Sequence, residues 1–67
     1  MRVADYLGAH VSDLLSSPPF SGWEFTRSPE HDWPTNVIWY EFEGHGVEVI
    51  CDLAERIQTI VLARGSG

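Results

Sequence analysis

The sequence predicts a small α+β domain, with helical turns at the N-terminus packed on a four-stranded, mostly antiparallel β-sheet. Three β-rich runs between Thr35 and Ala63, separated by two short turn-like stretches, are typical of an antiparallel meander. A shorter run with alternating apolar residues precedes the meander, and an amphipathic helical pattern precedes that run. We therefore expect residues 1–67 to form a single domain.

Length and cysteine content limit how such a domain is stabilised. A domain of this size, 67 residues, buries only roughly 60% of the surface that its unfolded chain exposes. Its one cysteine, Cys51, excludes an intrachain disulfide and a zinc site built from several cysteines. We expect no cofactor and no metal, and we expect self-association to supplement the small core.

The chain is strongly acidic. Ten acidic residues face four arginines, lysine is absent, and the formal net charge is −6. This charge argues against binding to nucleic acid or to anionic membranes, because both require a basic surface, and it favours a basic protein partner. Asp5 and His10 interrupt the apolar residues of the N-terminus, so we expect neither a signal peptide nor a membrane span there, and a cytoplasmic protein.

The first segment predicts one amphipathic helix or two shorter ones. Its apolar residues recur on one stripe at helical spacing: Val3, Leu7, Val11, Leu14 and Leu15. Gly8 lies inside this stripe and disfavours a helix by about 1 kcal/mol relative to alanine, so a break near Gly8 is the alternative. Ser12 is the expected cap of the second piece, and Pro18-Pro19 ends the helical region.

The next segment predicts a short strand from Trp23 to Arg27, followed by a loop. Trp23 and Phe25 alternate with polar residues, which is the period of a half-buried strand. Residues 28–34, SPEHDWP, are polar and contain two prolines, so we expect them to form a rigid loop.

The meander has one face that we expect to form the core. The residues of this core face are Ile38, Tyr40, Phe42, Val47, Val49 and Cys51. An even-numbered loop at Gly44-His45-Gly46 places the two strands' apolar sets on the same side. An even loop across residues 53–56 then sets Ile60 and Leu62 on the core face, whereas an odd loop would set Ile57 and Val61 there. We favour the even loop because it forms two aliphatic pairs with the preceding strand.

The opposite face, here called the far face, carries the functional prediction. Its large apolar residues are Val37, Trp39, Ile50, Ile57 and Val61. One helical segment covers only one face of a sheet, so we expect the far face to contact another molecule. The predicted contact surface is Trp39, Ile50, Ile57 and Val61, with Glu41, Glu48 and Asp52 as its acidic rim. Trp33, in the proline-bounded loop, is a further candidate anchor, since tryptophan is enriched at binding hot spots.

A small enzyme or ligand-binding domain is the competing hypothesis. Its site would use His31, Asp32 and His45. Adjacent residues of an extended loop point in different directions, and a histidine between two glycines is typical of a turn. Cys51, in an apolar strand, is expected to be a small buried hydrophobe. The residue pattern therefore favours a protein that is not an enzyme.

The segments NVIWYEFEG and GHGVEVICDLAERIQTIVL together resemble a unit of small bacterial α+β proteins related to immunity proteins and to the β-lactamase-inhibitor-protein-like repeat. The resemblance covers roughly residues 35–63 and is one of pattern, without a catalytic signature. It implies helical segments before an antiparallel sheet, and a sheet that serves as a binding face. Such proteins usually continue with a further unit after the equivalent of Ile60-Val61-Leu62, so this chain resembles a first half.

Together these observations predict a non-enzymatic protein-interaction module, of the inhibitor or immunity type. We expect it to act through the apolar, acid-rimmed far face, either on another protein or on a second copy of itself as a homodimer. The alternatives are the small enzyme or ligand-binding domain described above, and the N-terminal half of a longer α+β protein.

Overall fold

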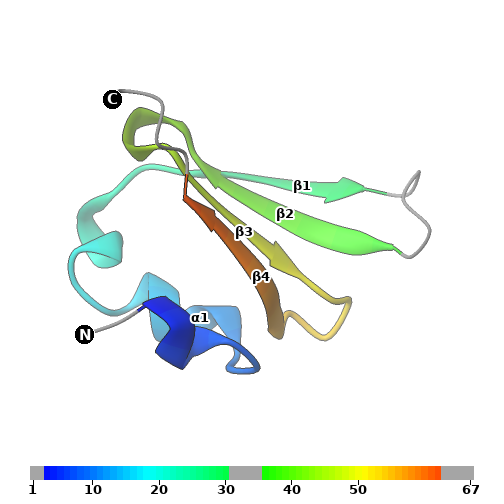
Figure 1. The fold of residues 1–67 in the computed structure, drawn as a ribbon. Coiled ribbons are helices and arrows are strands. Elements are labelled where there is room, and N and C mark those ends of the chain that lie inside the picture. Colours follow the sequence, from blue (N-terminus) through cyan, green and yellow to red (C-terminus); the bar gives the residue numbers. More distant parts are fainter. Residues whose placement is uncertain (1–2, 31–35, 63–67) are drawn as a thin grey trace.

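The fold is a four-stranded antiparallel sheet with the short helical segments of the N-terminal region packed on one of its faces (Figure 1). The computed structural model describes residues 3–30 and 36–62. The helical segments are η1 (Val3–Tyr6), α1 (Val11–Leu15), η2 (Phe20–Gly22) and η3 (Glu43–His45). The strands are β1 (Thr26–Glu30), β2 (Val37–Phe42), β3 (Val47–Cys51) and β4 (Ile57–Leu62), in the order β1-β2-β3-β4. The predicted antiparallel meander is confirmed.

The N-terminal region forms two short helical pieces with a break at Gly8. Gly8 has a φ of 86°, which only glycine adopts at little cost, and it separates η1 from α1. The cap of α1 is His10, whose Nδ1 accepts a hydrogen bond of 3.1 Å from the backbone N–H of Ser12. The expectation that Ser12 is the cap was wrong, because α1 begins at Val11. Within the described residues, no helix has the length and apolar character needed to cross a membrane.

The first strand begins and ends later than the sequence indicates. β1 runs from Thr26 to Glu30, not from Trp23 to Arg27, and it includes Pro29 from the expected loop. Proline is tolerated there because β1 is an edge strand, where a missing N–H need not break a ladder hydrogen bond. Trp23 follows η2 and packs against the core, with its ring 5.0 Å from that of Phe20.

The core lies between the helical segments and the core face of the sheet. All six expected core-face residues of β2 and β3 are buried, and the loop that joins these strands has an even number of residues, 43–46. The remaining buried apolar residues are Tyr6, Val11, Leu14, Phe20 and Ile57. Phe42 is fully buried, with ring-centroid distances of 5.8 Å to both Phe20 and Trp23. The prediction of this core face is confirmed.

The last strand combines both register alternatives through a β-bulge. Ile60 lies opposite Val49 and Leu62 opposite Val47, as the even loop predicts. Ile57 nevertheless lies opposite Cys51 and is only 1% exposed, so its placement on the far face was wrong. The physical reason is one extra residue in β4. Ile50 of β3 lies opposite Thr59, and the next residue of β3, Cys51, lies opposite Ile57, so Gln58 has no partner of its own in the register. Such a bulge shifts the alternation, so both isoleucines can face the core.

Candidate functional site

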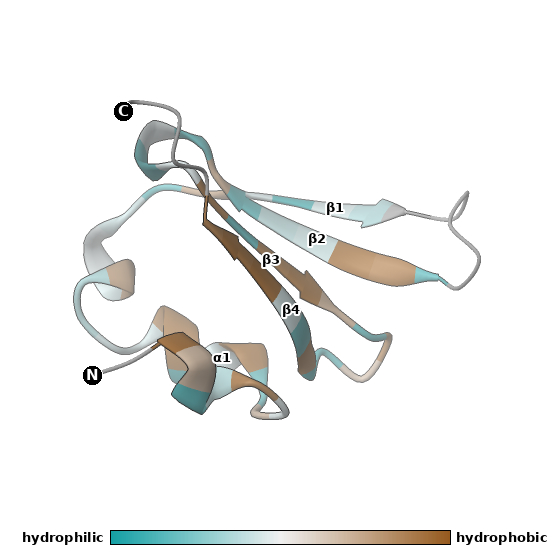
Figure 2. Cartoon of the chain, viewed as in Figure 1, coloured by the Kyte–Doolittle hydropathy of each residue, from teal (hydrophilic) through white to brown (hydrophobic). Residues whose placement is uncertain are grey.

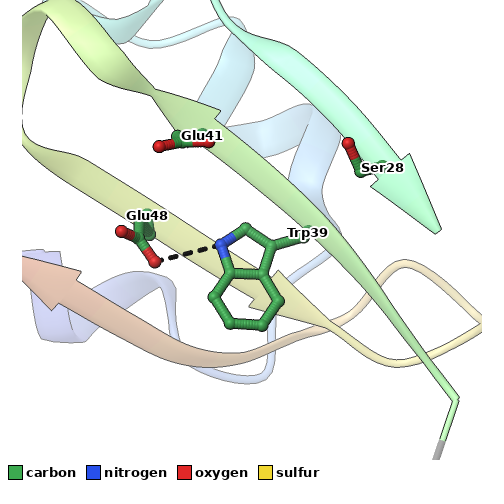
Figure 3. Close-up of a pocket in the computed structure, with 4 residues that line it drawn as sticks. All are labelled: Ser28, Trp39, Glu41 and Glu48. Carbon is green, nitrogen blue, oxygen red and sulfur yellow. Dashed lines mark hydrogen bonds between the residues drawn. The ribbon is translucent and has the colours of Figure 1, made fainter. Parts of the chain in front are cut away.

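The far face is the side of the sheet that the helical segments leave open. Figure 3 looks onto this face, and the helical segments lie behind the strands. Two rows of cross-strand neighbours run over it, Ser28–Trp39–Ile50–Thr59 and Thr26–Glu41–Glu48–Val61. The predicted contact residues Trp39, Ile50 and Val61 thus lie on one surface, with Glu41 and Glu48 beside them.

Trp39 lies at the centre of this surface and is only partly buried. Its indole extends over β3, and its Nε1–H donates a hydrogen bond of 3.0 Å to Oε1 of Glu48 (Figure 3). A hollow of about 350 Å³ adjoins the ring and is lined by Ser28, Trp39, Glu41 and Glu48. An aromatic side chain with a fixed polar contact and an adjoining hollow is a suitable anchor for a partner side chain.

Glu41 and Glu48 form an acidic pair directly opposite each other on β2 and β3. Like charges at such positions destabilise a sheet unless a cation relieves them. The described arginines make their contacts elsewhere: Arg27 reaches the hydroxyl of Tyr40 on the core-face side, and Arg56 donates to the carbonyl of Gly8. Within residues 3–30 and 36–62, neither carboxylate of the acidic pair has a basic partner.

Two of the expected surface residues have other positions. Asp52 organises the turn between β3 and β4, where its Oδ1 accepts hydrogen bonds of 2.9 Å from the backbone N–H groups of Ala54 and Arg56. Its Oδ2 accepts a further bond of 3.1 Å from the side chain of Gln58. Asp52 therefore has a structural role in this turn, and Ile57 is buried in the core. Trp33, the other candidate anchor, lies outside the described residues.

A polar cluster on the core-face side was missed by the sequence reasoning. The hydroxyl of Tyr40 donates to Oε1 of Glu55 and accepts a hydrogen bond of 3.1 Å from Nε of Arg27, which lies 3.7 Å from the same carboxylate oxygen. The bond from Tyr40 lowers the pKa of Glu55, while burial and the adjacent carboxylate raise the pKa of Tyr40. The only sequence signal for this cluster was a tyrosine on the core face, because a buried hydroxyl needs a hydrogen-bond partner. No residue spacing in the sequence indicated that Glu55 would be that partner.

The residues of the competing catalytic hypothesis are described only in part. His45 stacks on the indole of Trp23, with ring centroids 3.7 Å apart and planes within 8°. His31 and Asp32 lie outside the described residues. Cys51 is buried, and the loss of solvation raises the pKa of its thiol to about 11, which disfavours a thiolate at neutral pH. Within the described residues there is no group of three or more metal-ligating side chains.

Comparisons of the chain with protein-family models, with curated proteins and with solved structures give no match. The resemblance to immunity and inhibitor proteins thus stays a prediction from the sequence pattern. The geometry of the far face is the basis for a functional proposal.

Proposed function

We propose that this chain is a non-enzymatic protein-interaction module, of the inhibitor or immunity type, that binds a basic protein partner through the far face. The observation that carries the proposal is the position of Trp39 beside the acidic pair, on a sheet face that the described helical segments leave open. Exposed apolar surface next to unrelieved charge of one sign is a feature of recognition surfaces.

The expected partner surface combines an apolar centre with arginine or lysine side chains. Ile50, Val61 and the indole of Trp39 supply the apolar part of the contact. A cation placed over the acidic pair would relieve the repulsion between Glu41 and Glu48, and it would also lie near the face of an indole, where cations are attracted. The net charge of −6 adds long-range attraction for a basic partner.

The proposal is tested by truncating Trp39. Proteins captured from the native host by the wild-type chain are identified, and each purified candidate is titrated by calorimetry against wild type, Trp39→Ala and Leu53→Ala. Leu53 is a matched control, because it is 61% exposed and lies in the turn after β3, away from the far face. For a hot-spot tryptophan we expect Trp39→Ala to raise Kd by about 30-fold or more, and Leu53→Ala to leave it unchanged.

Salt dependence provides a second readout of the same titration. Binding of a basic partner to the acidic pair weakens as added salt screens the charges, and Glu41→Gln reduces this dependence. A captured protein that binds Trp39→Ala as tightly as wild type, with circular dichroism confirming that both chains are folded, would show that the far face is not the contact surface.

A further inference from the structure

The two edges of the sheet differ in their protection against pairing. β1 carries Pro29 and the charged Arg27, and both proline and charge are devices that discourage another strand from adding to an edge. β4, IQTIVL, contains neither a proline nor a charged residue. Figure 2 shows the contrast, with β1 hydrophilic and most of β4 hydrophobic.

On the edge of β4 that faces away from β3, only the first residue, Ile57, has backbone hydrogen bonds to other described residues. The N–H of Gly8 donates to the carbonyl of Ile57, and the N–H of Ile57 donates to the carbonyl of Ala9, both at 2.8 Å. From Gln58 to Leu62, no described backbone group bonds to the side of β4 that faces away from β3. Because backbone groups alternate in direction along a strand, this stretch presents N–H and C=O groups that have no backbone partner among the described residues, and another strand can satisfy them.

The last two side chains along this edge are apolar and exposed. Val61 is 41% exposed on the far face, and Leu62 is 52% exposed on the core face. Leu62 also borders a largely apolar hollow of about 250 Å³, whose lining includes Val3, Tyr6 and Phe20. A strand added to β4 would therefore gain main-chain hydrogen bonds and cover apolar surface on both faces of the sheet.

We propose that β4 pairs antiparallel with β4 of a second copy over Gln58–Leu62, so that two sheets join into one. The free stretch is centred on Ile60, which places the two-fold axis there and sets Ile60 opposite its counterpart. Thr59 then lies opposite Val61 of the second copy, and Gln58 opposite Leu62 of the second copy.

The chemistry of the strand favours a second copy as the occupant. Thr59, Ile60 and Val61 are β-branched residues, which form favourable cross-strand pairs, and a two-fold axis lets the same short stretch serve as both halves of the contact. A charged segment would find no opposite charge on β4 to select it. A chain of 67 residues also has a small core, and the joined sheets would extend it.

This contact shares only Val61 with the surface of the proposed function, because it uses the edge of β4 and leaves Trp39 and the acidic pair accessible. The two contacts respond oppositely to salt. Each copy carries a charge of −6, so screening strengthens the association of two copies, whereas it weakens the binding of a basic partner. Either contact can therefore fail without the other.

The test is sedimentation velocity of the full chain over a dilution series, at low and at high salt. We expect a concentration-dependent dimer in the wild type, with tighter association at high salt. Leu62→Lys places a charge beside the edge and is expected to raise the dimer Kd by about tenfold or more. Leu53→Lys makes the same change at an exposed leucine outside the edge and is expected to leave Kd unchanged.

Amide hydrogen exchange of the wild type gives a readout that needs no substitution. In the dimer, the outward amides of Gln58–Leu62 become protected as the concentration rises. A chain that stays monomeric at every concentration, with exchange of these amides independent of concentration, would overturn the proposal. So would a dimer that survives Leu62→Lys and is lost in Trp39→Ala, because that result would place the contact on the far face.

Discussion

The two faces of the sheet come from the same strands and the same alternation of residues, yet they have different environments. On the core face, Phe42 and Val49 are fully buried beneath the helical segments. On the far face of the same sheet, Trp39 and Ile50 are partly exposed and Val61 is exposed. Alternation thus creates two apolar faces, whereas the single helical layer determines which of them becomes the core. The other face is left to interact with water or with a partner.

The largest expected difference between the faces concerns stability. Phe42→Ala removes a fully buried ring from the centre of the aromatic cluster, and we expect a loss of about 3–5 kcal/mol in the free energy of unfolding. This approaches the whole stability that a core of this size supplies, so the variant should lack a cooperative transition in urea.

Ile50→Ala is the far-face counterpart of this change. Ile50 is only partly buried, so we expect its truncation to cost about 1 kcal/mol in the same urea titration. Equal losses for the two variants would show that the far face is packed as a second core and that the two faces do not differ in burial.

An intermediate effect is expected from the polar cluster at the margin of the core face. Tyr40→Phe removes the hydroxyl that contacts both Glu55 and Arg27, and we expect a loss of about 1 kcal/mol at neutral pH. Ser17→Ala is a suitable control, because the hydroxyl of Ser17 bonds to the carbonyl of Asp13 within the helical region, away from this cluster.

The pH dependence of stability checks the same cluster. The folded-state pKa of Glu55 lies below its ordinary value of 4.5, so its contribution is present above pH 4.5 and is lost as the pH falls through the lowered pKa. Tyr40→Phe removes the main cause of this shift. Urea titrations should therefore show a smaller loss of stability on acidification in Tyr40→Phe than in wild type; identical profiles would mean that Tyr40 does not set the pKa of Glu55.

The smallest expected effect comes from the acidic pair. Glu41→Gln removes one of two directly opposed charges and keeps the bond between Trp39 and Glu48, so we expect a gain of about 0.2–1 kcal/mol at low salt. The gain should shrink at high salt. Glu43→Gln, in η3, controls for the change in net charge alone. A loss of stability in Glu41→Gln, measured by thermal unfolding, would show that Glu41 has a favourable partner.

Local patterns in the sequence account for much of the fold. The alternation of β2 and β3, joined by an even loop, was sufficient to assign their core face, and the aliphatic pairs of Ile60 and Leu62 indicated the register of β4. Gly8 indicated a break between two helical pieces as the alternative to one helix, and the structure has this break. These features were predictable because side-chain direction and backbone preference repeat over two to four neighbouring residues.

The features that sequence reasoning missed depend on contacts between distant segments. Ile57 joins the core because a bulge follows the turn, and this turn is fixed by the hydrogen bonds of Asp52 and by backbone pairing of Ile57 with Gly8 and Ala9. The bond between Tyr40 and Glu55 also joins residues that are far apart in the sequence.

Residue identity and alternation are sufficient to specify a sheet with two apolar faces, an acidic rim and an uncharged last strand. Which residues of those faces are exposed depends on how the separate elements pack together. Tertiary packing buried Ile57, assigned Asp52 to a turn and set Glu41 directly opposite Glu48. Among the described residues, it also left the outer edge of β4 beyond Ile57 without a backbone partner. The physical reason is that exposure depends on how separate elements pack, and no local period encodes that packing.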